Sequence, residues 1–288
     1  MKAATILGIG AVTPLGRERE AIAAALAAPC ADLPSPRAVR DEFLDEPKIA
    51  KSLRRADRFV RMAAVAAVDA SNNISLERAG LIVVSGFGPH NRGFKFIDGI
   101  LDCGDAAALP TDFSHSVHNA AASYIAGLLD LRGPTLTATD FQIGFEQAIL
   151  LAQCWLEQGT CDRVLVGAVE ELGDVLKYSA ARMMKDAPPL GEGAIFLAMG
   201  PEHATGIARI DADASPTHVD LLITAESQIP PEFTPTRTAN FTDHFGHSAS
   251  IPAFQLLGAL LTDGFDNAQI FRRLLHSKMP ATLSLSKA

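Results

Sequence analysis

The sequence predicts an α/β protein in which helices cover both sides of buried sheets. Segments that read as strands alternate with segments of helical spacing along the whole chain, and several strands are apolar on both faces. The composition, 48% hydrophobic and 20% charged, suits a well-buried core. Because the 288 residues contain no clean linker and no low-complexity segment, we expect one compact domain spanning residues 1–288.

The first third of the chain predicts two strands and two helices. An apolar strand and a Gly/Pro loop span Ala3–Gly16, and a helix over Arg19–Pro29 ends at proline. Apolar residues at helical spacing predict a helix over about Ala56–Ser71, and the β-branched run Ala79–Pro89 predicts a strand. The glycines of "GIGAVTPLG" lack both the GxGxxG and the GK[ST] pattern, so they indicate a tight strand-to-loop turn and not a phosphate site.

The rest of the chain continues the alternation. Small residues predict a closely packed helix over His115–Leu131, and an apolar helix follows at Gly144–Gly159. A late helix is expected at Ser250–Gly264. The further strands expected are Pro134–Phe141, Asp162–Glu171, Gly191–Pro201, Val219–Glu226 and Ala281–Ser286.

The charge balance argues against nucleic-acid binding. The net charge is −8, from 25 basic and 33 acidic residues, whereas phosphate contact needs clustered Lys and Arg. The one basic cluster, Lys51–Arg61, is expected to be a solvated helix face; the alternative is a docking patch for an acidic partner. No apolar run is long enough to span a bilayer, so we expect no membrane partner.

The four cysteines show no CxxC spacing in a long chain, which is typical of reduced thiols in a cytoplasmic protein. Cys154 and Cys161 are interpreted as packing or loop residues. The pairs His115/His118 and His244/His247 could share a metal, but no acidic or Cys ligand stands at a telling distance. We therefore expect structural or hydrogen-bonding histidines, no metal and no cofactor.

The segment "DFQIG" (Asp140–Gly144) forms a corner between a predicted strand and a predicted helix. Corners of this kind often present a Ser or Cys nucleophile. Here the apex residue is Gln142, which neither titrates nor attacks a substrate. His247, in "GHSAS", is expected just before a helix N-terminus, where backbone N–H groups favour an anion.

Taken in order, these segments resemble the β-ketoacyl-acyl-carrier-protein synthases. "GIGAVTPLG", "RADRFVRMAAVAAVDA", "NAAASYIAGLLDLRGP", "CDRVLVGAVEE", "LGEGAIFLAMG" and "DHFGHSASIPAFQLLGALL" follow one another as in that family. Any one match is weak, but their order and spacing together are specific. The resemblance implies a thiolase-like layered αβαβα fold, here shortened.

The departures from the family pattern concern its catalytic residues. Gln142 stands where the family has its nucleophilic Cys, Ala225 (followed by Glu226) where it has the first His, and Asp243 where it has a Lys. Only the second His remains, as His247, and the C-terminal GFGG loop is missing. Losing a nucleophile that works as part of a unit costs on the order of 10⁴–10⁶ in rate, so we expect no condensing activity.

The resemblance then implies a chain length factor, the inactive partner of an active ketosynthase, as in type II polyketide and aryl polyene systems. The pair would shape the acyl tunnel, and acyl-carrier protein is a further partner that the resemblance implies. The expected dimer seam is the strand that carries Thr135, Thr137, Thr139 and Phe141. Two alternatives stay open: a malonyl-ACP decarboxylase or hydrolase that uses Gln142, His247 and Glu226, and a self-associating binding module.

Overall fold

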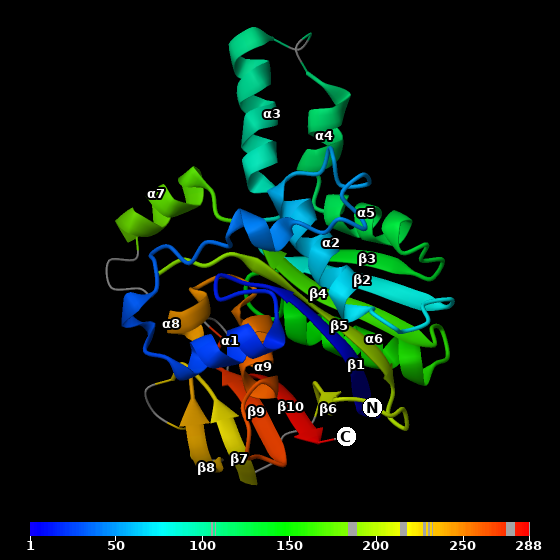
Figure 1. The fold of residues 1–288 in the computed structure, drawn as a ribbon, viewed down its shortest axis with the longest axis vertical. Coiled ribbons are helices and arrows are strands. Elements are labelled where there is room, and N and C mark those ends of the chain that lie inside the picture. Colours follow the sequence, from blue (N-terminus) through cyan, green and yellow to red (C-terminus); the bar gives the residue numbers. More distant parts are fainter. Residues whose placement is uncertain are drawn as a thin grey trace.

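The computed structural model is an α/β fold built on one large mixed sheet (Figure 1). It describes the chain except for residues 105, 107, 184–188, 214–217, 227, 228, 230, 232, 275–279 and 288. The ten strands lie in the order β3-β2-β4-β5-β1-β6-β10-β9-β7-β8. The predicted α/β class is therefore confirmed.

The first half of the sheet contains five strands, and its centre is buried on both faces. Strands β3, β2 and β4 are parallel, whereas β5 pairs antiparallel with β4 and with β1. Every residue of β2 is buried, as the apolar run had predicted. The strands are β1 (Ala4–Val12), β2 (Ala79–Ser85), β3 (Thr135–Thr139), β4 (Arg163–Glu170) and β5 (Gly193–Pro201).

The second half of the sheet continues from the first, because β6 pairs antiparallel with β1. Strand β10 pairs antiparallel with β6 and β9, and β7 lies parallel between β9 and β8. These strands are β6 (Ala208–Asp211), β7 (His218–Ile223), β8 (Thr234–Ala239), β9 (Asn267–Arg272) and β10 (Ala281–Lys287).

Helices form the other layers. α2 (Arg58–Ala70) and α5 (Ala120–Leu128) pack on the outer face of the first half. α6 (Gly144–Glu157) and α9 (Ile251–Leu260) share one apolar core with strands of both halves, so they form the central layer. On β10, half-exposed Thr282, Ser284 and Ser286 alternate with buried residues, which indicates that the outer face of the second half is partly open to solvent.

The remaining helices lie at the edges of these layers. α3 (His90–Cys103) and α4 (Pro110–Ser116) pack against each other and project from the body (Figure 1). The others are α1 (Arg19–Ala27), α7 (Asp174–Met183), α8 (Thr242–Phe245) and two 3-10 turns, Cys30–Asp32 and Asp41–Leu44. Within the described residues, none of the helices is long and apolar enough to cross a membrane.

One predicted helix is wrong. The segment His115–Leu131 is divided by extended backbone at Val117, so α4 and α5 are separate helices. α4 packs on α3, whereas α5 packs on α2. His118, between them, contacts Gly88 in the loop after β2. A change of direction at this point lets one segment serve two packing surfaces, which helical spacing alone could not reveal.

The interpretation of the first glycines is also wrong in part. Gly8 and Gly10 lie within β1, not in a turn, and a Cβ atom at Gly10 would meet the backbone oxygen of Ala66 in α2 at 1.9 Å. The missing side chains let α2 approach the strand closely. Only Gly16, with φ 145°, uses the conformational freedom of glycine in the turn that follows.

We predict that Gly10→Ala lowers the free energy of unfolding by roughly 2 kcal/mol or more, because the added methyl group overlaps the α2 backbone. Gly127→Ala is the matched control: it lies exposed in α5 with open space around it, and should raise stability by about 0.5–1 kcal/mol. Urea unfolding of both variants measures the difference. Equal stability of the two variants would contradict the close approach of α2 to β1.

Candidate functional site

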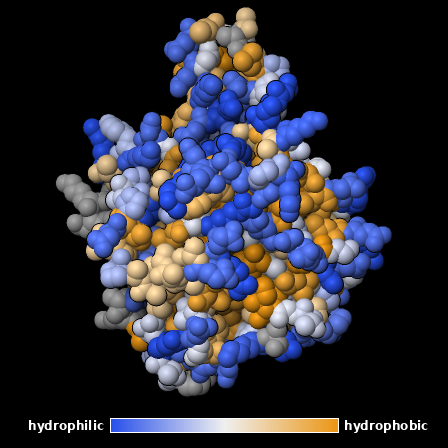
Figure 2. Space-filling model, viewed as in Figure 1, coloured by the Kyte–Doolittle hydropathy of each residue, from blue (hydrophilic) through white to orange (hydrophobic). Residues whose placement is uncertain are grey.

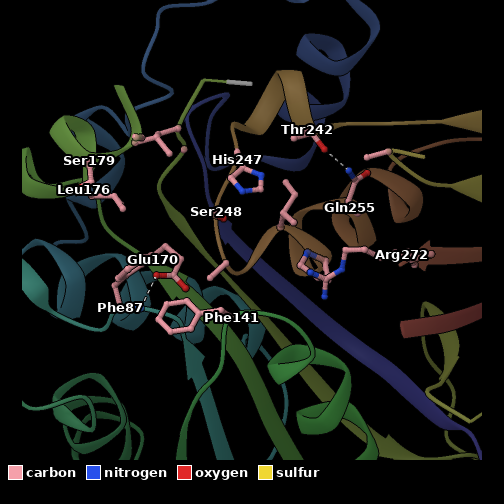
Figure 3. A pocket seen from close by; sticks show the side chains of 18 of the residues that line it. Phe87, Phe141, Glu170, Leu176, Ser179, Thr242, His247, Ser248, Gln255 and Arg272 are labelled. Carbon is pink, nitrogen blue, oxygen red and sulfur yellow. Dashed lines mark hydrogen bonds between the residues drawn. The ribbon is translucent and has the colours of Figure 1, made fainter. Parts of the chain in front are cut away.

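A cavity of about 850 Å³ lies between the two halves of the sheet. It opens where β4, β7 and β9 end, and the loop before α9 and the inner side of α7 also line it (Figure 3). Its walls are mostly apolar. Among them are Phe87, Phe94, Phe141, Leu176, Ile223 and Ile251. A concave, largely apolar space with a few polar groups is the usual form of a small-molecule site.

Four of the residues singled out from the sequence line this cavity: Phe141, Ala225, Glu226 and His247. The backbone of His247 is fixed by two hydrogen bonds, from its N–H to the carbonyl of Pro189 (2.7 Å) and to its carbonyl from the N–H of Gly191 (3.0 Å). Burial, together with the positive charge of Arg272, lowers the pKa of His247. The imidazole is therefore more readily neutral than a free histidine.

Gln142 stands at the expected corner but is not brought into the cavity; the described residues that line it include Phe141 and not Gln142. The corner is stabilised by Asp140, whose Oδ1 accepts hydrogen bonds from the N–H groups of Gln142 (2.7 Å) and Ile143 (2.5 Å). These donors precede α6, where an anion would otherwise be favoured. A carboxylate of the chain itself thus occupies the anion-binding position.

Asp243 lies away from the cavity. It is exposed on α8, and its backbone carbonyl accepts a hydrogen bond from Arg37 Nε at 2.9 Å. The histidines of the two sequence pairs have separate surroundings: His115 Nε2 lies 3.0 Å from Tyr124 Oη, and His244 Nε2 lies 3.2 Å from the carbonyl of Ala28. Across the described ranges, no three His, Cys, Asp or Glu residues gather as a metal site would require.

The strand expected at the dimer seam, β3, is the edge strand of the first half. Thr135 and Thr139 are exposed, Thr137 is half-buried, and Phe141, just after the strand, is 58% exposed. The Phe141 ring packs edge-on against Phe87 with 4.9 Å between centroids. The free edge of β3 therefore continues into an aromatic pair at the mouth of the cavity.

Glu170, at the end of β4, joins the parts that surround the cavity. Its buried carboxylate accepts hydrogen bonds from the N–H groups of Gly86 and Phe87 and from the hydroxyls of Ser85 and Ser250. Burial raises the pKa of this carboxyl group. Since Ser250 directly precedes α9, one side chain connects the strand, the loop after β2 and the start of the central helix.

Sequence reasoning missed Arg272, at the end of β9. Arg272 lines the cavity, and one of its terminal nitrogens donates to Glu146 Oε1 in the first turn of α6 at 3.0 Å. Burial raises the pKa of Glu146. The available signal was a pair of arginines directly after the strand segment "AQIF", but the sequence did not show that the end of β9 reaches the first turn of α6.

None of the four cysteines is among the described residues that line the cavity, and all four are free thiols. Burial raises the pKa of Cys161, which makes its thiol less reactive. Within the described part of the chain, the cavity therefore offers no thiol nucleophile.

The layers and strand order match thiolase-like ketosynthases among solved structures. The ketosynthase complex AntDE:AntF, described as a type II PKS acyl-carrier protein with its ketosynthase bound to the hexaketide, matches with a TM-score of 0.84 and 16% identity over 100% of both chains. The ishigamide ketosynthase/chain length factor matches with a TM-score of 0.76 and 18% identity over 99% of both chains. The ketosynthase ApeO in complex with its chain length factor ApeC from Xenorhabdus doucetiae matches with a TM-score of 0.65 and 14% identity over 100% of both chains.

These identities are low, so the structural matches establish the fold alone. The family follows from the sequence profile of the β-ketoacyl synthase N-terminal domain, which matches residues 46–198, more than half of the chain. The chain belongs to the β-ketoacyl synthase family. No curated protein sequence matches it.

Glu171, next to Glu170, carries a pH-dependent contribution to stability. Burial raises its pKa from 4.5 to about 7, although the N–H of Asn91 donates to it at 2.9 Å. A raised pKa in the folded state means that protonation stabilises the fold. This contribution is complete below about pH 4.5 and is lost as the pH rises through about 7.

We therefore predict that the wild type loses up to about 3 kcal/mol of unfolding free energy relative to Glu171→Gln between about pH 4.5 and pH 8. Glutamine keeps the shape of the side chain but does not titrate, so the difference isolates this one group. Denaturant unfolding of both proteins at several pH values measures it. A wild-type stability that stays constant relative to Glu171→Gln over this range, or that rises relative to it as the pH rises, would contradict the assignment.

Proposed function

We propose that this chain is a non-catalytic ketosynthase homologue that pairs with an active β-ketoacyl-ACP synthase and acts as its chain length factor. The observation that carries the proposal is the corner before α6. There a glutamine replaces a nucleophile, and Asp140 takes up the backbone donors that an oxyanion would need. Acyl transfer requires both a nucleophile and preorganised donors for the developing charge.

The remaining groups at the cavity do not replace what is lost. Ala225 has no polar side chain, and Asp243 is exposed away from the cavity. His247 could act as a base, but Gln142 does not lie beside it on the cavity wall. A decarboxylase built on Gln142 and His247 would need both side chains at one bound substrate, so this arrangement favours the non-catalytic role.

The surface supports pairing with another chain. β3 is a sheet edge whose backbone groups can extend a partner sheet. Its Leu136 is 40% exposed, and the projecting α3 carries a stripe of exposed apolar residues, Phe94, Ile97 and Leu101. Figure 2 shows apolar surface between the hydrophilic side chains of this projection. Exposed apolar side chains that lie together in this way often mark a protein–protein interaction surface.

The finer features of the proposal follow from the family resemblance. The seam would include Thr135, Thr137, Thr139 and Phe141, and the cytoplasmic pair would shape the acyl tunnel in chain elongation of the polyketide or aryl polyene type. A carrier protein approaches the pair to deliver acyl groups. That two of the structurally similar proteins are complexes of a ketosynthase with a chain length factor supports this arrangement.

We predict that the purified chain, incubated with malonyl-ACP, produces no acetyl-ACP above the uncatalysed rate. Mass spectrometry of the carrier protein measures the product. We also predict that Gln142→Cys does not gain condensing activity, because the two other catalytic positions stay altered and Asp140 still occupies the donors. Turnover by the wild type that disappears in His247→Ala would overturn the non-catalytic assignment.

We predict that co-expression with an active ketosynthase of a type II system yields a heterodimer, and that Leu136→Glu weakens it at least tenfold. A charge placed on the edge strand must be desolvated when a partner strand covers it. Tyr178→Glu is the matched control, because Tyr178 is exposed on α7, outside the proposed seam. Size-exclusion chromatography with light scattering measures the oligomeric state. If only a homodimer of this chain forms, the proposal is contradicted.

A further inference from the structure

The cavity contains one strong cation in a largely apolar space. Of the described residues that line it, only Arg272 is a lysine or an arginine. In Figure 3 its side chain extends from the end of β9 toward the centre of the cavity, on the side opposite Phe141 and Glu170. We propose that the cavity binds an amphipathic monocarboxylate, a free carboxylate on an aliphatic chain, with the carboxylate on the Arg272 guanidinium.

Arg272 has donors to spare. Its guanidinium offers five N–H groups, and its hydrogen bond to Glu146 Oε1 uses one of them. Nε of Arg272 is buried without a partner among the described residues, and so is Glu146 Oε2. The ion pair between Arg272 and Glu146 is thus made through one nitrogen and one oxygen, and it is not bidentate. The Arg272 side chain is 26% exposed, so its terminal N–H groups can reach an acceptor in the cavity, and a carboxylate is the acceptor whose geometry suits them.

The charges around Arg272 favour a monoanion over a dianion. Glu146 already balances part of the positive charge, and Glu226 adds a carboxylate to the wall. The two histidines of the wall, His90 and His247, both have a lowered pKa, so neither supplies a second positive charge at neutral pH. A phosphate dianion would bring two negative charges to one cation that already lies among acidic groups. A carboxylate brings one negative charge, which the single positive charge of Arg272 can balance.

The rest of the cavity suits an aliphatic chain. The wall also includes the apolar side chains of Ile223, Ile251, Ile270, Phe271, Phe87 and Phe141. Each buried methylene should strengthen binding about fourfold, so a longer carboxylate should bind better than acetate until the space is filled. This ligand would bind inside the cavity of this chain. The inference therefore does not depend on pairing with a ketosynthase.

The competing interpretation is a structural ion pair that only ties β9 to α6. Both interpretations predict that removing Arg272 affects the fold, so a variant alone cannot separate them. Ligands that differ only in the head group can, because they are compared on the unaltered protein. A structural pair would not distinguish octanoate from octan-1-ol or octanamide, whereas a carboxylate site would.

The experiment measures binding of octanoate, octan-1-ol, octanamide, acetate and inorganic phosphate by calorimetry and by the shift in melting temperature. We expect octanoate to bind the wild type at least tenfold more tightly than each of the others and to raise the melting temperature. Arg272→Gln should abolish the preference for octanoate over octan-1-ol. Arg209→Gln, which removes an exposed arginine on β6, should keep it.

If Arg272→Gln does not fold, Arg272→Lys serves instead, since lysine keeps the charge but not the fork; the preference should then shrink. Equal binding of octanoate and octan-1-ol, no binding of either, tighter binding of phosphate, or a preference that persists without Arg272 would each overturn the inference.

Discussion

The buried carboxyl group of Glu170 is the interaction on which the arrangement around the cavity depends. It accepts hydrogen bonds from the loop after β2 and from Ser250 at the start of α9, so it holds the first half of the sheet against a central helix that packs on the second. A buried carboxyl group is tolerated only when its oxygens are satisfied, and here four donors converge on it. This cluster therefore holds the start of α9 against the loop after β2 at one wall of the cavity.

Under the proposed function, the corner before α6 is a catalytic position of the family that has become a structural one in this chain. The backbone of the strand–corner–helix unit remains, and α6 still packs between the two halves of the sheet. Its exposed N–H donors, however, are satisfied by Asp140. Once a carboxylate of the chain fills the site for developing negative charge, a nucleophile at Gln142 would gain little. Both Gln142 and Asp140 therefore fit a corner that has no catalytic role.

The cavity persists although it offers no thiol among its described residues. The ion pair between Arg272 and Glu146 crosses from β9 to α6 and places a cation where the wall is otherwise apolar. Surface and cavity thus point to two separate interactions: a partner chain along β3 and α3, and a small amphipathic anion inside. The first is tested at Leu136 and the second at Arg272, so either can fail without the other.

Local patterns in the sequence determined the α/β class, the strands β2, β4 and β5 and the helices α2 and α6, because period and apolar content are properties of neighbouring residues. They also indicated His247 and Gln142, since these stand in recognisable segments. The break between α4 and α5, the packing role of Gly8 and Gly10, the separation of Gln142 from the cavity, and the meeting of Arg272 with Glu146 required the folded chain. Each of these depends on which distant segments touch, and contacts between residues 126 positions apart leave no periodic trace in a single sequence.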